Sequence, residues 1–596
     1  MKRLLPYVGP LLAFAALVCF ESDYLYRAQE LNLFLDTSLF LRQCMTTAGG
    51  LLTWTGAYLT QYFHYPVLGA ALLCLLWALL MWLMKLTFRL PRSWMLTTLV
   101  PVACLLLTVT DLGYWIFYLK LRGHLFDATL GTLVAVGLAF LYLHIPPKYG
   151  IRSVYIVLAA CIGYPLFGFY ALWAVVLMAL LPGRAVNRLL ALLMVAAVPL
   201  ACYHLLYHKT HIVNIYWAAL PVFCHTGQRY FAYNLPYIVL VASTVVMALC
   251  YRKERKEQQP PRYWRWGQAA LLAAAAVCVV VFWYKNDNFH RELSMMRHLE
   301  QEEWEQAVST SANVKDEPTR AICIMRNIAL ARLGRQGDEM FRHPNGAKRP
   351  DAPFPVRMVD VMGRLIYLKY GVLNYCYRWC MEDGVEYGWS VEKLKLMAEC
   401  SLLNGEFVAA HKYLSLLKKC SFQGEWAKKY TAYARSPQLM AKDPELRAIM
   451  RLQRPDNFLT SDMSQLEKFL LEHFATARSA EPSLQEQTLI AAMQTKDARL
   501  FWETFYQYSR THQGGQRLPR HYQEAVCLFA HLQHADDSQM HLDPQVVKDY
   551  EDFARTMDGY RQHGWSIDQI RPKMYDRFHT TFFYDFYFNR YNYIEP

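Results

Sequence analysis

The chain has 596 residues and a net charge of +13, and 54% of its residues are hydrophobic. This length accommodates two or more domains, and much of the positive charge lies in short loops between apolar segments. That distribution argues against nucleic-acid binding, which needs basic side chains gathered on one soluble face. We expect an all-α protein with a polytopic membrane domain in residues 1–284 and a helical-repeat domain in residues 285–596.

The N-terminal apolar stretch from Leu4 to Phe20 follows Lys2 and Arg3, as in a signal peptide. No small-x-small cleavage site follows it, so we expect it to be retained as the first transmembrane helix. Eight further apolar spans follow it along the chain. The nine expected spans are residues 4–20, 67–84, 95–118, 126–144, 153–165, 166–182, 188–206, 235–251 and 267–284. The fifth and sixth form one long apolar stretch, and Gly163-Tyr164-Pro165 within it favours a re-entrant hairpin or a tight turn.

The distribution of Lys and Arg over the loops indicates the orientation. With the N-terminus in the cytoplasm, fifteen basic residues lie in cytoplasmic segments and six in the opposite loops. An odd number of spans then places residues 285–596 on the other side. The sequence therefore predicts a multi-pass protein of the cytoplasmic membrane with an extracytoplasmic (periplasmic) C-terminal domain.

The long first outer loop, residues 21–65, begins with two carboxylates, Glu21 and Asp23, directly after the first span. Ionisable residues at membrane depth are costly and mark candidate functional sites. These two could bind a divalent cation or deprotonate a hydroxyl group; the alternative is ordinary charge at the level of the lipid headgroups. The loop also carries two amphipathic stretches, Leu31–Leu41 and Leu51–Phe63, of the kind that lie flat on a membrane.

This combination of an acidic pair after the first span, a long first outer loop, many further spans and a C-terminal outer domain resembles the GT-C class of membrane glycosyltransferases. Enzymes of this class transfer sugars from polyprenyl-phosphate carriers. The resemblance covers residues 1–284 by architecture and implies that Asp23 is the catalytic base, with Glu21 as the alternative. It also implies an acidic residue in the second outer loop, for which Asp111 and Asp127 are the candidates. The Glu-x-Asp spacing departs from the commoner adjacent Asp-Glu pair, which leaves the choice of base open.

The chain is also similar to an uncharacterised Bacteroidetes family of membrane proteins with a C-terminal tetratricopeptide-like domain. That similarity supports the topology and implies no activity.

Two further sets of side chains could bind a ligand or an ion. Guanidinium and ammonium groups bind phosphate, so four basic residues are candidate ligands of a lipid phosphate: Arg27, Lys120, Arg122 and Arg229. The spacing of His204, His208 and His211 predicts that they share one helix face. Together with His225 they could hold zinc or copper, for which imidazole is a suitable ligand; the alternative is that they bond to phosphates, carbonyls or water.

The C-terminal region has the helical spacing of tetratricopeptide repeats. Ala398, Gly405 and Ala410 stand where such repeats need small residues, and Asn404-Gly405-Glu406 predicts a turn between two helices. Its last stretch, Phe578–Tyr593, is rich in aromatic residues. We expect it to be a terminal helix that caps the last repeat, and the alternative is that its rings lie at the membrane interface or bind sugars.

Three functions are compatible with these patterns. The first is a glycosyltransferase of the GT-C type that uses a polyprenyl-phosphate sugar at the outer face of the membrane. The second is a non-catalytic scaffold whose repeat domain binds a protein partner, through a concave face near Trp379 and Tyr413. The third is a transporter that uses Asp111 and the histidines; no paired broken helices or internal duplication support it.

Overall fold

The computed structural model describes residues 5–120, 123–146, 150–207, 210–225, 227–251, 262–312, 315–454, 459–511, 517–535 and 540–591. Within these residues the protein is all-α except for one short hairpin, in which β1 (Cys224–His225) pairs antiparallel with β2 (Gln228–Arg229). The chain divides into two compact units. The first unit contains residues 1–285, 383–395 and 414–428, and the second contains the rest.

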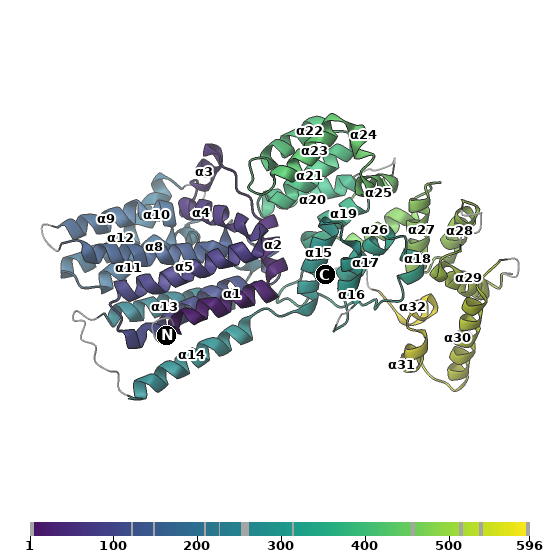
Figure 1. Ribbon diagram of the computed structural model, residues 1–596, viewed down its shortest axis with the longest axis horizontal. Helices are drawn as coiled ribbons and strands as arrows, with labels where there is room; N and C mark the ends of the chain where they lie inside the picture. Colours follow the sequence, from purple (N-terminus) through teal and green to yellow (C-terminus); the bar gives the residue numbers. More distant parts are fainter. Residues whose placement is uncertain are drawn as a thin grey trace. The chain divides into compact units, whose positions relative to one another are not determined.

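Residues 1–285 of the first unit form fourteen α-helices within the described part of the chain (Figure 1). They are α1 (Val8–Phe20), α2 (Ser22–Glu30), α3 (Ser38–Cys44), α4 (Gly50–Thr60), α5 (Pro66–Thr87), α6 (Leu99–Thr110), α7 (Trp115–Tyr118), α8 (His124–His144), α9 (Ile151–Cys161), α10 (Gly163–Phe167), α11 (Phe169–Leu180), α12 (Ala185–Leu205), α13 (Leu235–Leu249) and α14 (Arg262–Phe282). Short 3-10 turns lie at Leu5–Tyr7, Gln61–His64, Arg92–Thr98, Ile212–Trp217 and Phe231–Asn234.

The long apolar helices of this unit run side by side as a bundle (Figure 1). Helix α8 packs against α4, α5 and α11. Small residues allow this close approach, because a Cβ atom at Gly131 would lie 2.3 Å from the ring of Tyr170 on α11. Trp77 on α5 is fully buried and donates a hydrogen bond from its Nε1 to the hydroxyl of Thr129 (2.9 Å). These contacts place α8 in the core of the bundle.

The bundle is that of a multi-pass membrane protein. Among the described residues, five helices are long and apolar enough to cross a bilayer, and the number rises to seven if the bent pairs α1–α2 and α14–α15 (α15, Asp287–Glu300) each count as one span. Helices α9 and α11 are apolar but shorter. Each of the nine spans expected from the sequence falls on one of these apolar helices, while the full count of nine and the orientation stay predictions.

The turn expected at Gly163-Tyr164-Pro165 contains the short helix α10, which packs on α4 and α9. Gly168 ends it with a φ of +57°, a left-handed conformation that favours glycine. The first loop, residues 21–65, also differs in detail from expectation. Residues 31–37 are not helical, and α4 packs along α8 with Leu52 and Ala57 buried. Attachment of this loop to a membrane surface stays a prediction.

The remaining helices cover residues 287–588. They are α15 (Asp287–Glu300), α16 (Trp304–Ala312), α17 (Arg320–Arg332), α18 (Gln336–Glu339), α19 (Arg364–Lys369), α20 (Leu373–Glu386), α21 (Val391–Leu403), α22 (Phe407–Leu417), α23 (Gly424–Arg435), α24 (Pro437–Met440), α25 (Pro444–Leu452), α26 (Leu466–Ala475), α27 (Pro482–Thr495), α28 (Ala498–Thr511), α29 (Arg520–Gln533), α30 (Pro544–Gln562), α31 (Ile567–Phe578) and α32 (Phe582–Phe588). A π-helix precedes α19 at Val359–Gly363.

Helical hairpins are present where the small-residue spacing indicates them. Helices α21 and α22 are joined at residues 404–406, with Gly405 at a φ of +75° and both Ala398 and Ala410 fully buried. A regular array of repeats stays a prediction. The aromatic C-terminal stretch supplies core residues, because Phe582, Phe583 and Phe588 are buried in the same cluster as α28 to α30. Its described rings therefore pack inside the protein.

Candidate functional site

The site begins where the first apolar helix ends. Helix α1 stops at Phe20, and α2 leaves at 79° to it. Glu21 occupies this break and is only 2% exposed. Its Oε1 accepts a hydrogen bond of 2.6 Å from Nε1 of Trp283, which directly follows α14. Asp23, in the first turn of α2, is half-buried.

The end of α6 is anchored to the same place. The hydroxyl of Tyr24 donates to the carbonyl oxygen of Val109 (2.8 Å), and the amide of Tyr284 donates to the carbonyl oxygen of Thr110 (2.9 Å). Asp111 follows α6 directly and is half-buried. The Tyr24 hydroxyl interacts electrostatically with the carboxyl groups of both Glu21 and Asp111. The ends of α1, α6 and α14 therefore meet around Tyr24.

A third carboxyl group, that of Asp127, lies in the first turn of α8 and is 1% exposed. Its oxygens have no hydrogen-bond partner among the described residues. The carboxyl group lies on Gly56 of α4, because a Cβ atom there would be 1.9 Å from Oδ1 of Asp127. The buried hydroxyl of Tyr237 interacts electrostatically with both Asp111 and Asp127. Tyr24 and Tyr237 thus connect Glu21, Asp111 and Asp127, which we call the carboxylate cluster.

A buried carboxylate is unfavourable unless a cation, a hydrogen-bond donor or a proton neutralises it. Glu21 has the donor of Trp283. Asp127 has two oxygens without a partner in the described part of the chain, so it is suited to hold a proton or to accept a hydrogen bond from a ligand. The arrangement can therefore accept a proton from a hydroxyl group at membrane depth.

A small cavity of about 60 Å³ lies beside this region, between the first loop and residues 116–125. Its walls include Asn32, Thr60 and His124. Oδ1 of Asn32 and Nε2 of His124 have no hydrogen-bond partner among the described residues. The cavity has room for a few water molecules, and its polar atoms can hold them.

Of the four basic residues expected to bind a lipid phosphate, Arg27 is engaged by the protein itself. Its guanidinium pairs with the carboxylate of Glu392 at 3.1 Å, and both side chains are buried, at 1% and 4% exposure. Lys120 is exposed after α7, and Arg229 is exposed in β2. Arg122 lies outside the described residues. Arg27 thus pairs with a protein carboxylate.

The first loop makes further contacts with residues 383–395 and 414–428, which belong to the same unit. Lys395 pairs with the buried Glu30 at 3.0 Å. The amide of Ser421 donates to Oε1 of Gln61 (2.9 Å), and the ring of Phe422 stacks on His64. These contacts hold the first loop at several points.

His204 and His211 do not share a helix. Helix α12 ends at Leu205, just after His204, and His211 is extended, with its Nδ1 accepting from the amide of Val213 (3.3 Å). His208 and the side chain of His225 lie outside what the structure describes. Among the described residues no group of three or more His, Cys, Asp or Glu side chains could hold a metal ion. The prediction of a shared helix face was wrong because it assumed a continuous helix from His204 to His211, whereas α12 ends at Leu205.

Several residues of the site were not foreseen from the sequence. Trp283, Tyr24 and Tyr237 carry no motif, and the only sequence signal is their place at the ends of apolar spans, where aromatic residues are common. Glu392 is 365 positions from its partner Arg27. Trp379, expected on a partner-binding face, is buried and donates from Nε1 to Oδ2 of Asp462 (2.7 Å). Its ring is therefore a core element.

The comparisons with known proteins identify a family and no activity. The model of DUF6057, a family of unknown function, matches residues 2–589, so the chain belongs to this family. No curated protein and no solved structure matches the chain.

Proposed function

Because membership of the DUF6057 family assigns no activity, we propose from the site itself that the protein is a membrane glycosyltransferase of the GT-C type. It transfers a sugar from a polyprenyl-phosphate donor at the outer face of the cytoplasmic membrane. In this proposal the N-terminus is cytoplasmic and the second unit is extracytoplasmic, as the loop charges indicate.

One observation supports the proposal more than any other: Asp111, after α6, interacts with Tyr24 together with Glu21 and with Tyr237 together with Asp127, so it links the carboxyl groups of the first and second loops. Glu21 ends the first span, Asp111 follows α6 and Asp127 begins α8. A transferase of this type needs a carboxylate base close to the membrane surface, where a lipid-linked donor can reach it. Asp23 is two residues from Glu21 and, being half-buried, is the more accessible base.

Each residue has a role in this mechanism. Asp23 takes the proton from the hydroxyl group of the acceptor as the new glycosidic bond forms. Glu21, fixed by Trp283, and Asp111 are positioning residues that orient the acceptor hydroxyl. The exposed Arg229 and Lys120 are the basic side chains available to a departing lipid phosphate.

The experiment that tests this function is complementation of a deletion strain. Asp23→Asn and Glu21→Gln change the charge of a side chain at nearly constant shape. Both variants should therefore reach wild-type levels in the membrane but fail to correct the defect of the deletion strain. Glu382→Gln is the matched control, because the Glu382 side chain is 48% exposed and pairs with Arg378 on its own helix. Normal complementation by both Asp23→Asn and Glu21→Gln would rule the proposal out.

A second function, a non-catalytic scaffold, is favoured by a different observation. The contacts of Arg27 with Glu392 and of Glu30 with Lys395 bind the first loop to residues from the C-terminal half of the sequence. In a scaffold whose membrane part serves as an anchor, such contacts would attach the C-terminal half of the sequence to that anchor. Helical-repeat domains commonly bind proteins. A scaffold should tolerate Asp23→Asn and Glu21→Gln and should lose function when the exposed surface of α22 near Tyr413 is changed.

A further inference from the structure

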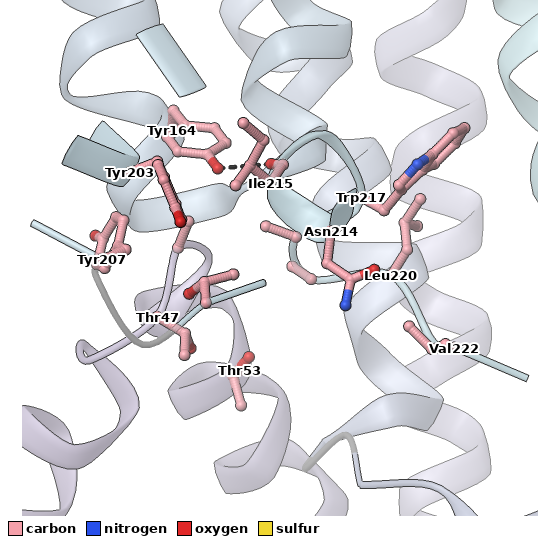
Figure 2. Close-up of a pocket in the computed structure, with 14 residues that line it drawn as sticks. Thr47, Thr53, Tyr164, Tyr203, Tyr207, Asn214, Ile215, Trp217, Leu220 and Val222 are labelled. Carbon is pink, nitrogen blue, oxygen red and sulfur yellow. Dashed lines mark hydrogen bonds between the residues drawn. The ribbon is translucent and has the colours of Figure 1, made fainter. Parts of the chain in front are cut away.

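A second cavity of the membrane unit, of about 160 Å³, is lined by fourteen residues (Figure 2). Its walls come from the start of α4, from α10, from the end of α12 and from residues 210–222. Figure 2 shows Tyr203, Tyr207 and Thr47 on one side, with Asn214 and Trp217 on the other. None of these residues belongs to the carboxylate cluster.

The lining of this cavity combines apolar surface with uncharged polar groups. Among the residues that the structure describes, the fourteen that line it include no Asp, Glu, Lys, Arg or His. They offer instead hydroxyl groups, from Thr53, Tyr203 and Tyr207, and the side-chain amide of Asn214. The rings of tyrosine and tryptophan add apolar faces. Hydroxyl and amide groups next to aromatic faces suit a neutral ligand that has both hydroxyl groups and C–H surfaces.

The walls are held by hydrogen bonds between segments that are distant in sequence. The Tyr164 hydroxyl donates to the carbonyl oxygen of Ile215 (2.6 Å). The amide of Phe169 donates to the carbonyl oxygen of Ala218 (2.9 Å), and the amide of Gly49 donates to the carbonyl oxygen of Pro165 (2.9 Å). Ala219, at the wall, has a φ of +70°, a conformation that a residue with a Cβ atom rarely adopts. Such strain persists only where the surroundings fix it, and it is frequent at ligand sites.

Part of the cavity's surroundings is apolar. Trp217 and Val222 line the cavity and have exposed side chains, and the nearby residues Leu206 and Ile212 are exposed as well. In a membrane protein such side chains face lipid or the membrane interface. A ligand can therefore reach the cavity while its apolar part stays in contact with these side chains.

We propose that this cavity binds a single neutral glycosyl ring, either free or at the head of a lipid. Its volume is below the roughly 300–1,000 Å³ of sites for drug-sized molecules, which suits a group of the size of one ring. The hydroxyl and amide groups bond to sugar hydroxyls, and the aromatic rings face the sugar C–H surface. This inference rests on the proposed function in one respect, the expectation that the neutral ligand is a sugar. Binding at equilibrium does not require that the protein be catalytic.

The test uses the full-length protein in phospholipid nanodiscs and measures saturable binding of radiolabelled octyl glycosides (gluco, galacto and manno) below their micellar concentrations. At least one glycoside should bind. Tyr207→Phe should weaken it about two- to tenfold, the effect of one hydrogen bond. Thr47→Trp should abolish binding by filling the cavity from an exposed rim position. Tyr58→Phe, an exposed tyrosine outside the lining, is the matched control and should bind as the wild type does.

Competition by methyl glycosides and by octanol identifies the source of the ligand. If the methyl glycoside competes as strongly as the unlabelled octyl glycoside of the same sugar, the ligand is a free sugar. If it competes more weakly, the ligand is a sugar carried by a lipid. Full competition by octanol would overturn the proposal, because the chain and not the ring would then be recognised. So would the absence of saturable binding for all three glycosides, or wild-type binding by both Tyr207→Phe and Thr47→Trp. Binding is measured at equilibrium, without turnover, and the proposed catalysis is tested separately by complementation with Asp23→Asn and Glu21→Gln, so a failure of this inference and a failure of the proposed catalysis are distinguishable.

Discussion

Nε1 of Trp283 donates a hydrogen bond of 2.6 Å to Oε1 of Glu21, and so joins the end of the first apolar helix to the residue after α14. Glu21 is almost completely buried. A buried carboxylate that loses its donor is costly. This bond therefore fixes both the position of the carboxylate and the meeting of two helix ends.

Replacement of Trp283 by Phe should destabilise the protein by about 1–3 kcal/mol, because it leaves Glu21 buried without this donor. Glu21→Gln keeps an amide oxygen that can accept the same bond, so its effect on the melting temperature in detergent should be smaller. A Trp283→Phe, Glu21→Gln double variant should recover part of the loss. Equal melting temperatures for Trp283→Phe and the wild type would show that the bond contributes nothing.

The buried pair of Arg27 and Glu392 gives a second test. Arg27→Ala or Glu392→Ala alone should cost about 3–5 kcal/mol, because each breaks a buried ion pair. A double-mutant cycle measured by thermal unfolding should show strong coupling. The control pair, Arg378 and Glu382, is exposed and should couple by less than about 1 kcal/mol.

The same variants separate two roles for Arg27. If its main role is to bind a lipid phosphate, Arg27→Ala should reduce function and leave the melting temperature unchanged. If its main role is the ion pair with Glu392, Arg27→Ala should instead lower the melting temperature.

The contact between Gly56 and Asp127 predicts a rescue. Gly56→Ala would place a Cβ atom 1.9 Å from Oδ1 of Asp127, so it should destabilise the protein by about 1–3 kcal/mol. Asp127→Ala in the same chain should restore much of this loss by removing the overlapping carboxyl group. Gly137→Ala is the matched control on α8, because the nearest atom to its Cβ is 3.9 Å away, and it should be neutral or slightly stabilising. Additive effects of Gly56→Ala and Asp127→Ala would contradict the contact.

The second unit should lose stability in mild acid. Burial, followed by nearby charges including Arg326 and Arg335, lowers the pKa of His343 from 6.5 to about 4. Between these values the unfolded chain binds the proton and the folded chain does not, so stability falls as the pH drops from about 6.5 towards 4. His343 is only partly buried and lies 3.9 Å from Glu339, so we expect a loss of about 1 kcal/mol after screening. Hydrogen exchange in α17 should follow this change, and His343→Asn should remove it.

The apolar helices were predictable from the sequence because hydrophobicity is a property of consecutive residues. All nine expected spans fall on apolar helices, and the turn at Gly405 follows from local residue types. The helix end at Leu205 was not predictable, because no glycine or proline marks it, and the predicted histidine face failed for that reason.

Long-range pairing was beyond the sequence pattern. The pairing of Arg27 with Glu392 depends on contacts between residues that are distant in the chain, and single charged residues carry no sign of their partners. The proximity of Glu21 and Asp111 to Tyr24 likewise depends on how the ends of helices that are distant in the sequence pack together, which no local pattern indicates. The roles of Asp23 and Glu21 in catalysis stay predictions from the resemblance.

The central claim is that Asp23 and Glu21 serve the transfer of a sugar from a polyprenyl-phosphate donor. Mass spectrometry of membrane lipids tests it most directly, in a deletion strain that expresses wild-type protein, Asp23→Asn, Glu21→Gln or the control Glu382→Gln. We predict that a polyprenyl-phosphate sugar accumulates in the deletion strain and in both carboxylate variants, and returns to the parental level with the wild type and the control. Identical lipid-linked sugar pools in all of these strains would contradict the account.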